Sequence, residues 1–149
     1  MTTLTTPGST TAPGLVPVVA ATSTLAAIGF TALGAHDWTE IAVIAGAVVV
    51  TSAIVFGWVV PHALRQESAG GTALALTIPA VLLVVPAFWS GVPLVLGAAG
   101  LLVGNAGRRA PRGAGMCIAG VVLGALAVAG YVTIYVSDVM NGGAGFLFD

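Results

Sequence analysis

The sequence predicts an all-α integral membrane protein with five transmembrane helices, and three observations lead to this fold class. Hydrophobic residues make up 58% of the 149 residues and charged residues only 6%, whereas a soluble domain carries roughly 25% charged residues to solvate its surface. The apolar residues form long runs of the length that a helix needs to cross a bilayer. The four arginines fall in two of the loops between these runs. Lipid is therefore the expected surrounding of most of the chain.

The clearest apolar run follows an arginine-rich turn. Arg108, Arg109 and Arg112 precede an uncharged segment that continues as far as Asp138. A basic loop ahead of such a segment is typical of a helix that leaves the cytoplasmic face of a membrane. The sequence predicts a transmembrane helix over residues 114–136, and the other runs have to alternate around it.

The N-terminal part of the chain predicts a tail and two helices. Residues 1–14 are rich in Thr, Pro and Gly, so we expect a disordered tail. The first span is predicted over residues 15–35 and the second over residues 41–62, each about 30 Å long or slightly more. No Arg or Lys precedes the first run, which favours an uncleaved helix over a signal peptide.

The middle of the chain, residues 72–106, allows two interpretations. A single helix of this length would extend about 52 Å, far more than a bilayer needs. The turn residues Trp89-Ser90-Gly91-Val92-Pro93 favour a break, so we predict spans over residues 72–89 and 92–106. Two prolines are expected to bend the first of these helices, namely Pro79 and Pro86. The alternative is four spans with a re-entrant or irregular hairpin around residues 72–106.

The charges predict the orientation of the protein. With five spans, all arginines lie on one side, which the positive-inside rule assigns to the cytoplasm; they are Arg65, Arg108, Arg109 and Arg112. The acidic residues of the other side are Asp37, Glu40, Asp138 and Asp149. We expect a cell-membrane protein with a cytoplasmic N-terminus, a membrane domain over residues 15–137 and an external C-terminal tail over residues 138–149. A hairpin around residues 72–106 would preserve this orientation.

Aromatic and hydroxyl side chains are expected to have ordinary structural roles. Five aromatic residues lie near predicted helix ends or in the outer part of the last helix, where a headgroup belt is favoured over cofactor stacking; they are Trp38, Trp58, Trp89, Tyr131 and Tyr135. Six hydroxyl side chains within the spans are expected to hydrogen-bond the carbonyl four residues earlier in their own helix; they are Thr22, Ser23, Thr24, Thr51, Ser52 and Thr77.

The residue types of catalytic and metal sites are scarce. His36 and His62 lie at opposite ends of the second predicted helix, about 39 Å apart, and cannot share one ion. The lone cysteine, Cys117, excludes an internal disulfide and has no neighbouring base. No catalytic motif is present, and no charged residue falls within a predicted span. We therefore expect no enzyme, no cofactor and no catalytic, cofactor-binding or metal-ligating residue.

Small residues at regular spacing indicate how the predicted helices pack. Gly100-x-x-x-Gly104 and Gly120-x-x-x-Gly124 each place two glycines on one helix face, which allows helices to approach closely in a membrane. A chain with 21 glycines also contains such spacings by chance. Because the loop between the last two predicted helices is short, we expect them to pack as an antiparallel pair through these glycines. Gly100 and Gly120 are expected at similar depth.

One segment is similar to a known family. The sequence from Arg112 to Gly124, RGAGMCIAGVVLG, resembles a GRGLAIAGIVLG type segment of a widespread small bacterial membrane domain of unknown function. Members of that family pair two helices around a basic loop. The resemblance extends over residues 94–130, with an inserted alanine and with Cys117 at a position that is usually alanine. It implies no activity.

These observations favour a non-enzymatic scaffold, accessory or oligomer-forming component of a bacterial membrane. The alternative is a small transporter or channel component, although pumps usually depend on intramembrane charges that this chain lacks. The expected partners are the lipid bilayer and either a second copy of the chain or another membrane protein. The net charge of −1 indicates no nucleic-acid partner.

Overall fold

The computed structural model describes residues 14–34, 37–65, 69–109 and 113–141, and every regular element within these ranges is a helix. The elements are α1 (Leu15–Gly34), α2 (Trp38–Ile54), the π-helix η1 (Val55–Val59), α3 (Val60–Arg65), α4 (Ala69–Leu83), the 3-10 helix η2 (Phe88–Ser90), α5 (Val92–Gly107) and α6 (Ala114–Met140). α2, η1 and α3 follow one another without a break and are counted as one helix, so the described residues form five helices besides the short η2. The predicted all-α class and the five helices are confirmed.

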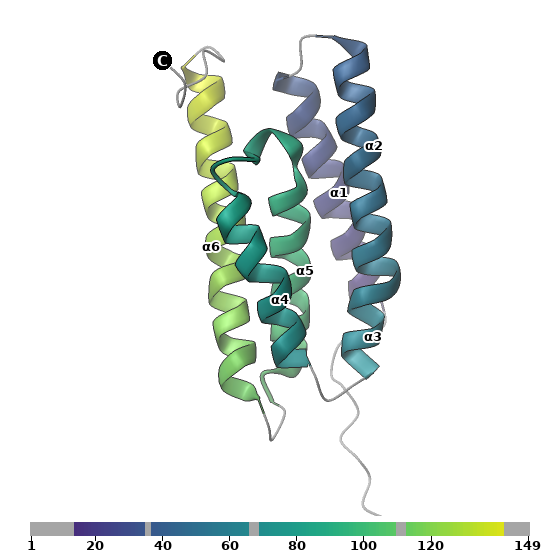
Figure 1. The fold of residues 1–149 in the computed structure, drawn as a ribbon, viewed down its shortest axis with the longest axis vertical. Coiled ribbons are helices and arrows are strands. Elements are labelled where there is room, and N and C mark those ends of the chain that lie inside the picture. Colours follow the sequence, from purple (N-terminus) through teal and green to yellow (C-terminus); the bar gives the residue numbers. More distant parts are fainter. Residues whose placement is uncertain (1–13, 35–36, 66–68, 110–112, 142–149) are drawn as a thin grey trace, which may run out of the picture.

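The five helices differ in length. Three are long and apolar enough to cross a membrane: Leu15–Leu33, Trp38–Arg65 and Ala114–Met140. The other two, α4 and α5, contain 15 and 16 residues, which corresponds to only about 22–24 Å of helix against about 30 Å of hydrocarbon. We call the three long helices, α1, α2–η1–α3 and α6, the frame of the bundle. The shorter α4 and α5 lie beside them and extend over only part of their length (Figure 1).

The predicted helix over residues 72–89 is too long at its C-terminal end. α4 ends at Leu83, and residues 84–87 form a turn that leads into η2. Pro86 explains the early end, since proline disfavours helical geometry at the residue before it and lacks the N–H that the next turn needs. Pro79, in contrast, lies inside α4. At the other end of the chain, α6 continues four residues beyond its predicted end at position 136.

Two glycines set the entry angles of α5 and α6. Gly91, with φ of 68°, joins η2 to α5, and Gly113, with φ of 81°, precedes α6. Both conformations belong to the left-handed region, which glycine adopts without a steric cost. Pro93 lies in the first turn of α5, where its missing N–H breaks no helical hydrogen bond. The N-terminus of α2 is capped by Asp37, whose carboxylate accepts the Glu40 N–H at 2.8 Å.

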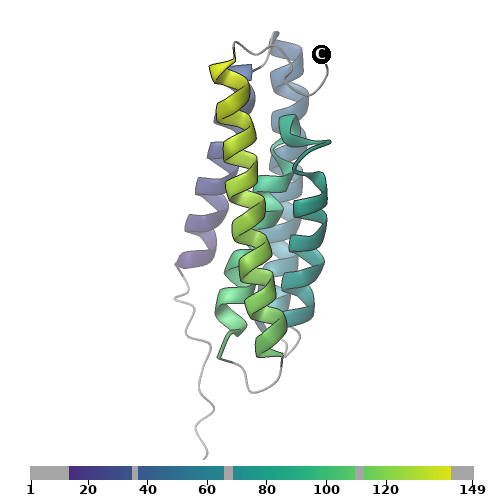
Figure 2. The same ribbon diagram turned by 90° about the vertical axis from the view of Figure 1, so that its left-hand side faces the viewer.

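α4, η2 and α5 form a hairpin whose two ends lie at the same end of the bundle (Figures 1 and 2). Gly70 in α4 and Gly107 in α5 both lie against Cys117, near the start of α6. At the tip of the hairpin, Gly91 lies against Ala27 of α1 and Val48 of α2. Both α1 and α2 continue about 10–15 Å past these contacts, at about 1.5 Å per residue. The tip therefore stops short of the far end of the frame.

Candidate functional site

Two of the predicted packing glycines lie where α5 meets α6. A Cβ atom added to Gly104 would lie 2.7 Å from the carbonyl oxygen of Cys117. A Cβ atom added to Gly124 would lie 2.8 Å from the carbonyl oxygen of Gly97. In both cases the neighbour is backbone, which cannot rotate away as a side chain does. Glycine is therefore required at both positions for the present distance between these helices.

The other two predicted glycines face α4. A Cβ atom added to Gly120 would lie 2.7 Å from Cβ of Ala73, and one added to Gly100 would meet Cγ2 of Thr77. Gly100 also lies against the carbonyl oxygen of Ala73, so Gly100 and Gly120 are at similar depth. The prediction that α5 and α6 pack through all four glycines is therefore correct for only two of them. The other two contact α4, so the interface joins three helices.

The sequence of α4 contains small residues that pack against α5 and α6, and a search for paired glycines does not find them. Gly70, Ala73 and Thr77 recur at three- and four-residue spacing and are all buried. Residues at such spacings share one face of a helix. Alanine and threonine serve as the small residues of membrane helix interfaces in the same way as glycine. A search for small residues of any type would have included this face.

The arginines gather at one end of the bundle. Arg65 ends α3, and Arg108 and Arg109 follow α5; all three are exposed. The ends of α3 and α5 lie at the same end as the start of α6 (Figure 1). Arg112 lies outside the described residues. The opposite end carries Asp37 and Glu40 at the start of α2 and Asp138 in the last turns of α6.

The tyrosines of α6 belong to the core, so the predicted aromatic belt is wrong for them. Tyr131 is 0% exposed and Tyr135 is 5% exposed. The Tyr135 hydroxyl donates a hydrogen bond to the carbonyl of Phe30 in α1, and the rings of Phe30 and Tyr131 meet edge to face at 5.9 Å. Both tyrosines continue the buried face that begins with Cys117. The three tryptophans, in contrast, are exposed on the outer surface.

The hydroxyl of Tyr131 is an exception to the hydrogen bonding of this core. Within the described part of the chain it has no hydrogen-bond partner, although it is buried. A buried donor without a partner costs about 1–3 kcal/mol. This group lies in the same core cluster as Ala27 and Val48, the two residues that contact the hairpin tip.

The histidines and the cysteine, the residue types that could serve metal or catalytic chemistry, do not lie together. His62 is exposed near the end of α3, and its ring lies 6.4 Å from that of Trp58. His36 lies outside the described residues. Cys117 is buried against Gly107 and Gly70. Among the residues that the structure describes, no three His, Cys, Asp or Glu side chains are grouped closely enough to hold a metal ion.

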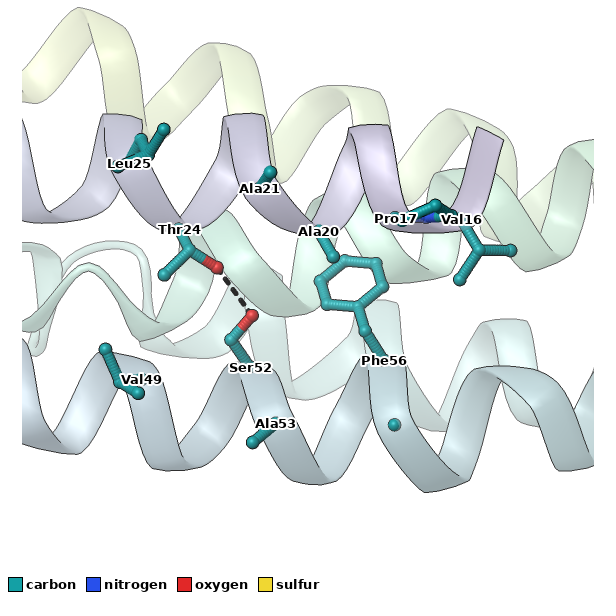
Figure 3. Close-up of a pocket in the computed structure, with 11 residues that line it drawn as sticks. Val16, Pro17, Ala20, Ala21, Thr24, Leu25, Val49, Ser52, Ala53 and Phe56 are labelled. Atoms are coloured by element: carbon teal, nitrogen blue, oxygen red, sulfur yellow. Dashed lines mark hydrogen bonds between the residues drawn. The ribbon is translucent and has the colours of Figure 1, made fainter. Parts of the chain in front are cut away.

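Two hydroxyl groups depart from the predicted bonding to their own helix. Thr22, Ser23 and Thr77 do donate to the carbonyl four residues earlier, at 2.8, 2.7 and 2.9 Å. Thr24 of α1 and Ser52 of α2 instead share a hydrogen bond of 2.5 Å between the two helices (Figure 3). This pair was not recognisable from the sequence, because nothing in the spacing of either hydroxyl indicates a partner on another helix.

The Thr24–Ser52 pair lies in an apolar groove between α1 and α2. The groove has a volume of about 780 Å³ and opens to the outside of the bundle. Its walls are mainly small side chains, including Ala20, Ala21, Ala53 and Gly57, and the ring of Phe56 extends across it towards Ala20 (Figure 3). Phe56 and Gly57 belong to the π-helix η1, a type of local widening that is frequent at functional sites.

Comparison with known proteins adds no relative. No protein family, no curated protein and no solved structure matches this chain. The resemblance of residues 94–130 to the small bacterial membrane domain therefore stays a prediction.

Proposed function

We propose that this chain is a non-enzymatic component of a bacterial cell membrane, a scaffold, accessory or oligomer-forming subunit that acts through helix packing. The observation that carries the proposal is the contact of backbone with backbone where α5 meets α6, at Gly104 and Gly124. An interior packed this closely is rigid. The sequence of residues 69–107 contains no charged side chain, so it supplies no intramembrane proton relay of the kind that pumps use.

The outer faces of the long helices are the surfaces on which such a component would bind its partner. They carry large exposed apolar side chains, for example Leu33 on α1, Val43 on α2 and Leu126 on α6. Lipid solvates these side chains in the monomer. A partner helix gains from van der Waals packing against them when the surfaces fit.

Photo-crosslinking in intact membranes tests this function. A photoreactive amino acid is placed singly at Leu33, Val43 or Leu126, which are 76%, 67% and 58% exposed. At one of these faces we expect a discrete protein adduct, either a dimer of the chain or a complex of one further mass. Because a specific interface covers one face, the other positions should yield lipid adducts. Lipid adducts at all three positions would contradict the proposal.

The orientation is part of the proposal. We place the arginine-bearing end in the cytoplasm, because basic residues are retained there, and Asp138 at the external end. The N-terminus is then cytoplasmic and the C-terminus external. We further propose that the α4–α5 hairpin enters and leaves from the arginine side, as its length and the position of its tip indicate.

Cysteine labelling in a Cys117→Ala background tests the orientation. Ser90→Cys reports the hairpin tip, and Asn141→Cys reports the exposed end of α6. With a membrane-impermeant maleimide added to intact cells, we expect Asn141→Cys to react rapidly and Ser90→Cys to react much more slowly, since the tip lies below the surface. Equal reactivity at both positions would show that the hairpin crosses the bilayer. Protection of Asn141→Cys would reverse the proposed orientation.

A second function, a small transporter or channel component, is favoured by one observation. The hairpin breaks its helical structure at Val84, which lies against Gly130, the residue before the buried Tyr131. At this depth irregular backbone is usually found only in protein interiors or beside water-filled cavities. Broken helices of this kind form binding sites in transporters. Substrate-dependent flux in proteoliposomes that is lost in Tyr131→Phe would favour this function over the first.

A further inference from the structure

The groove between α1 and α2 has the dimensions of one leaflet of the membrane. On α1 it extends from Val16 to Leu25, and on α2 and η1 from Val49 to Gly57. These segments are about 12–14 Å long at about 1.5 Å per residue. Half of the hydrocarbon core measures about 15 Å. The length of the groove therefore matches the depth of one leaflet.

The two ends of the groove differ in polarity. The end at Val16 and Gly57 faces the arginine end of the bundle, and Arg65 lies farther along the same continuous helix. The other end is near the hydrogen bond between Thr24 and Ser52. A molecule that fits this groove should be apolar over the length of a hydrocarbon chain and negatively charged beyond the interfacial end.

We propose that the groove binds one acyl chain of an anionic phospholipid from the leaflet on the arginine side, with the phosphate lying towards Arg65. The apolar walls match the chain, and Arg65, eight residues beyond Gly57 on the same continuous helix, matches the charge of the headgroup. All four cationic side chains of the sequence are arginines, which bind phosphate with two parallel hydrogen bonds. This inference goes beyond the proposed function and does not depend on it.

A second copy of the chain fits the groove less well. A helix with its side chains is about 10–12 Å across and would need a furrow that continues along the bundle. At Thr24 and Ser52 the hydroxyl oxygens of α1 and α2 are 2.5 Å apart, so the two helices are joined there. A single hydrocarbon chain is narrow enough to end below this contact, whereas a helix is not.

Gly57 allows the groove to be filled without disturbing the interior. A Cβ atom added to Gly57 meets no atom within 4 Å, and the same is true of Gly46 on the same helix. Gly46 does not line the groove. Gly57→Leu therefore places a side chain in the lipid position, and Gly46→Leu is the matched control for the glycine-to-leucine change. Ala21→Leu fills the groove from the opposite wall, in case Gly57→Leu does not fold.

Lipid binding is measured on the full-length protein in mild detergent. Phosphatidylglycerol and phosphatidylcholine are added separately, and the melting temperature and the number of bound lipids in native mass spectra are recorded. For the parent and Gly46→Leu we expect one retained phosphatidylglycerol and a higher melting temperature with this lipid. Gly57→Leu and Ala21→Leu should lose both effects. Arg65→Gln should weaken the preference for the anionic lipid roughly fivefold, the effect of one basic residue near a membrane surface.

Two results would overturn the proposal. One is retention of phosphatidylglycerol by Gly57→Leu and Ala21→Leu at the level of the parent. The other is a parent dimer that both filling variants convert to a monomer, which would assign the groove to a second copy of the chain.

Discussion

Gly104→Leu is expected to lower the stability of the protein more than an equivalent change on its outer surface. A side chain at this position meets the carbonyl oxygen of Cys117 at 2.7 Å and the backbone nitrogen of Val121 at 3.1 Å. Because neither neighbour can rotate away, α5 and α6 have to separate. Overpacking of this kind costs about 1–3 kcal/mol, and the lost contacts are those that hold helices together in lipid.

The matched control for this change is Gly115→Leu. Gly115 lies in the first turn of α6, and a Cβ atom there meets nothing within 4 Å. Leucine favours the helix over glycine by up to about 1 kcal/mol, so the control should melt at or above the parent temperature. Thermal unfolding in mild detergent compares the three proteins. Equal melting of Gly104→Leu and Gly115→Leu would mean that the glycines reflect composition alone.

Much of the fold could be predicted because long apolar runs have few alternatives. Once the run after Arg112 is taken as a helix that leaves the cytoplasmic face, the remaining runs and their charges follow the rules of membrane insertion. The break between α4 and α5 could also be predicted from Trp89, Ser90 and Gly91, and the structure has η2 and the left-handed Gly91 at this point. These features depend on local chemistry.

The features that were not predicted depend on contacts between helices. The sequence predicts too late an end for α4 because Pro86 is expected to bend the helix, whereas the helix ends before it at Leu83. Tyr131 and Tyr135 were assigned to the membrane interface from their position along the helix. Their burial depends on Phe30, which lies on α1 at the other end of the chain.

The packing site was predicted in part. Gly100, Gly104, Gly120 and Gly124 all lie in close helix contacts. The sequence does not state which helix each one faces, because glycines four residues apart share one broad face but differ in direction by about 40°, which is enough to meet different neighbouring helices. Paired glycines alone therefore do not indicate the role of Ala73, which lies against both Gly100 and Gly120.

A double-mutant cycle at Gly120 and Ala73 tests whether α4, α5 and α6 form one closely packed core. In the structure a Cβ atom on Gly120 would lie 2.7 Å from Cβ of Ala73, so the space between α4 and α6 holds one methyl group but not two. Gly120→Ala should therefore destabilise the protein. Ala73→Gly should also destabilise it, since it removes a buried methyl group and adds a helical glycine.

The double variant exchanges the two residues and leaves a single methyl group in the same space. We expect it to unfold at a higher temperature than Gly120→Ala alone, with a coupling energy of about 0.5–3 kcal/mol, as is typical of residues in direct contact. Thermal unfolding of the parent, the two single variants and the double variant in the same detergent measures this coupling. If the effects of the two substitutions simply add, α4 and α6 do not meet at this point and the three helices do not form one closely packed core.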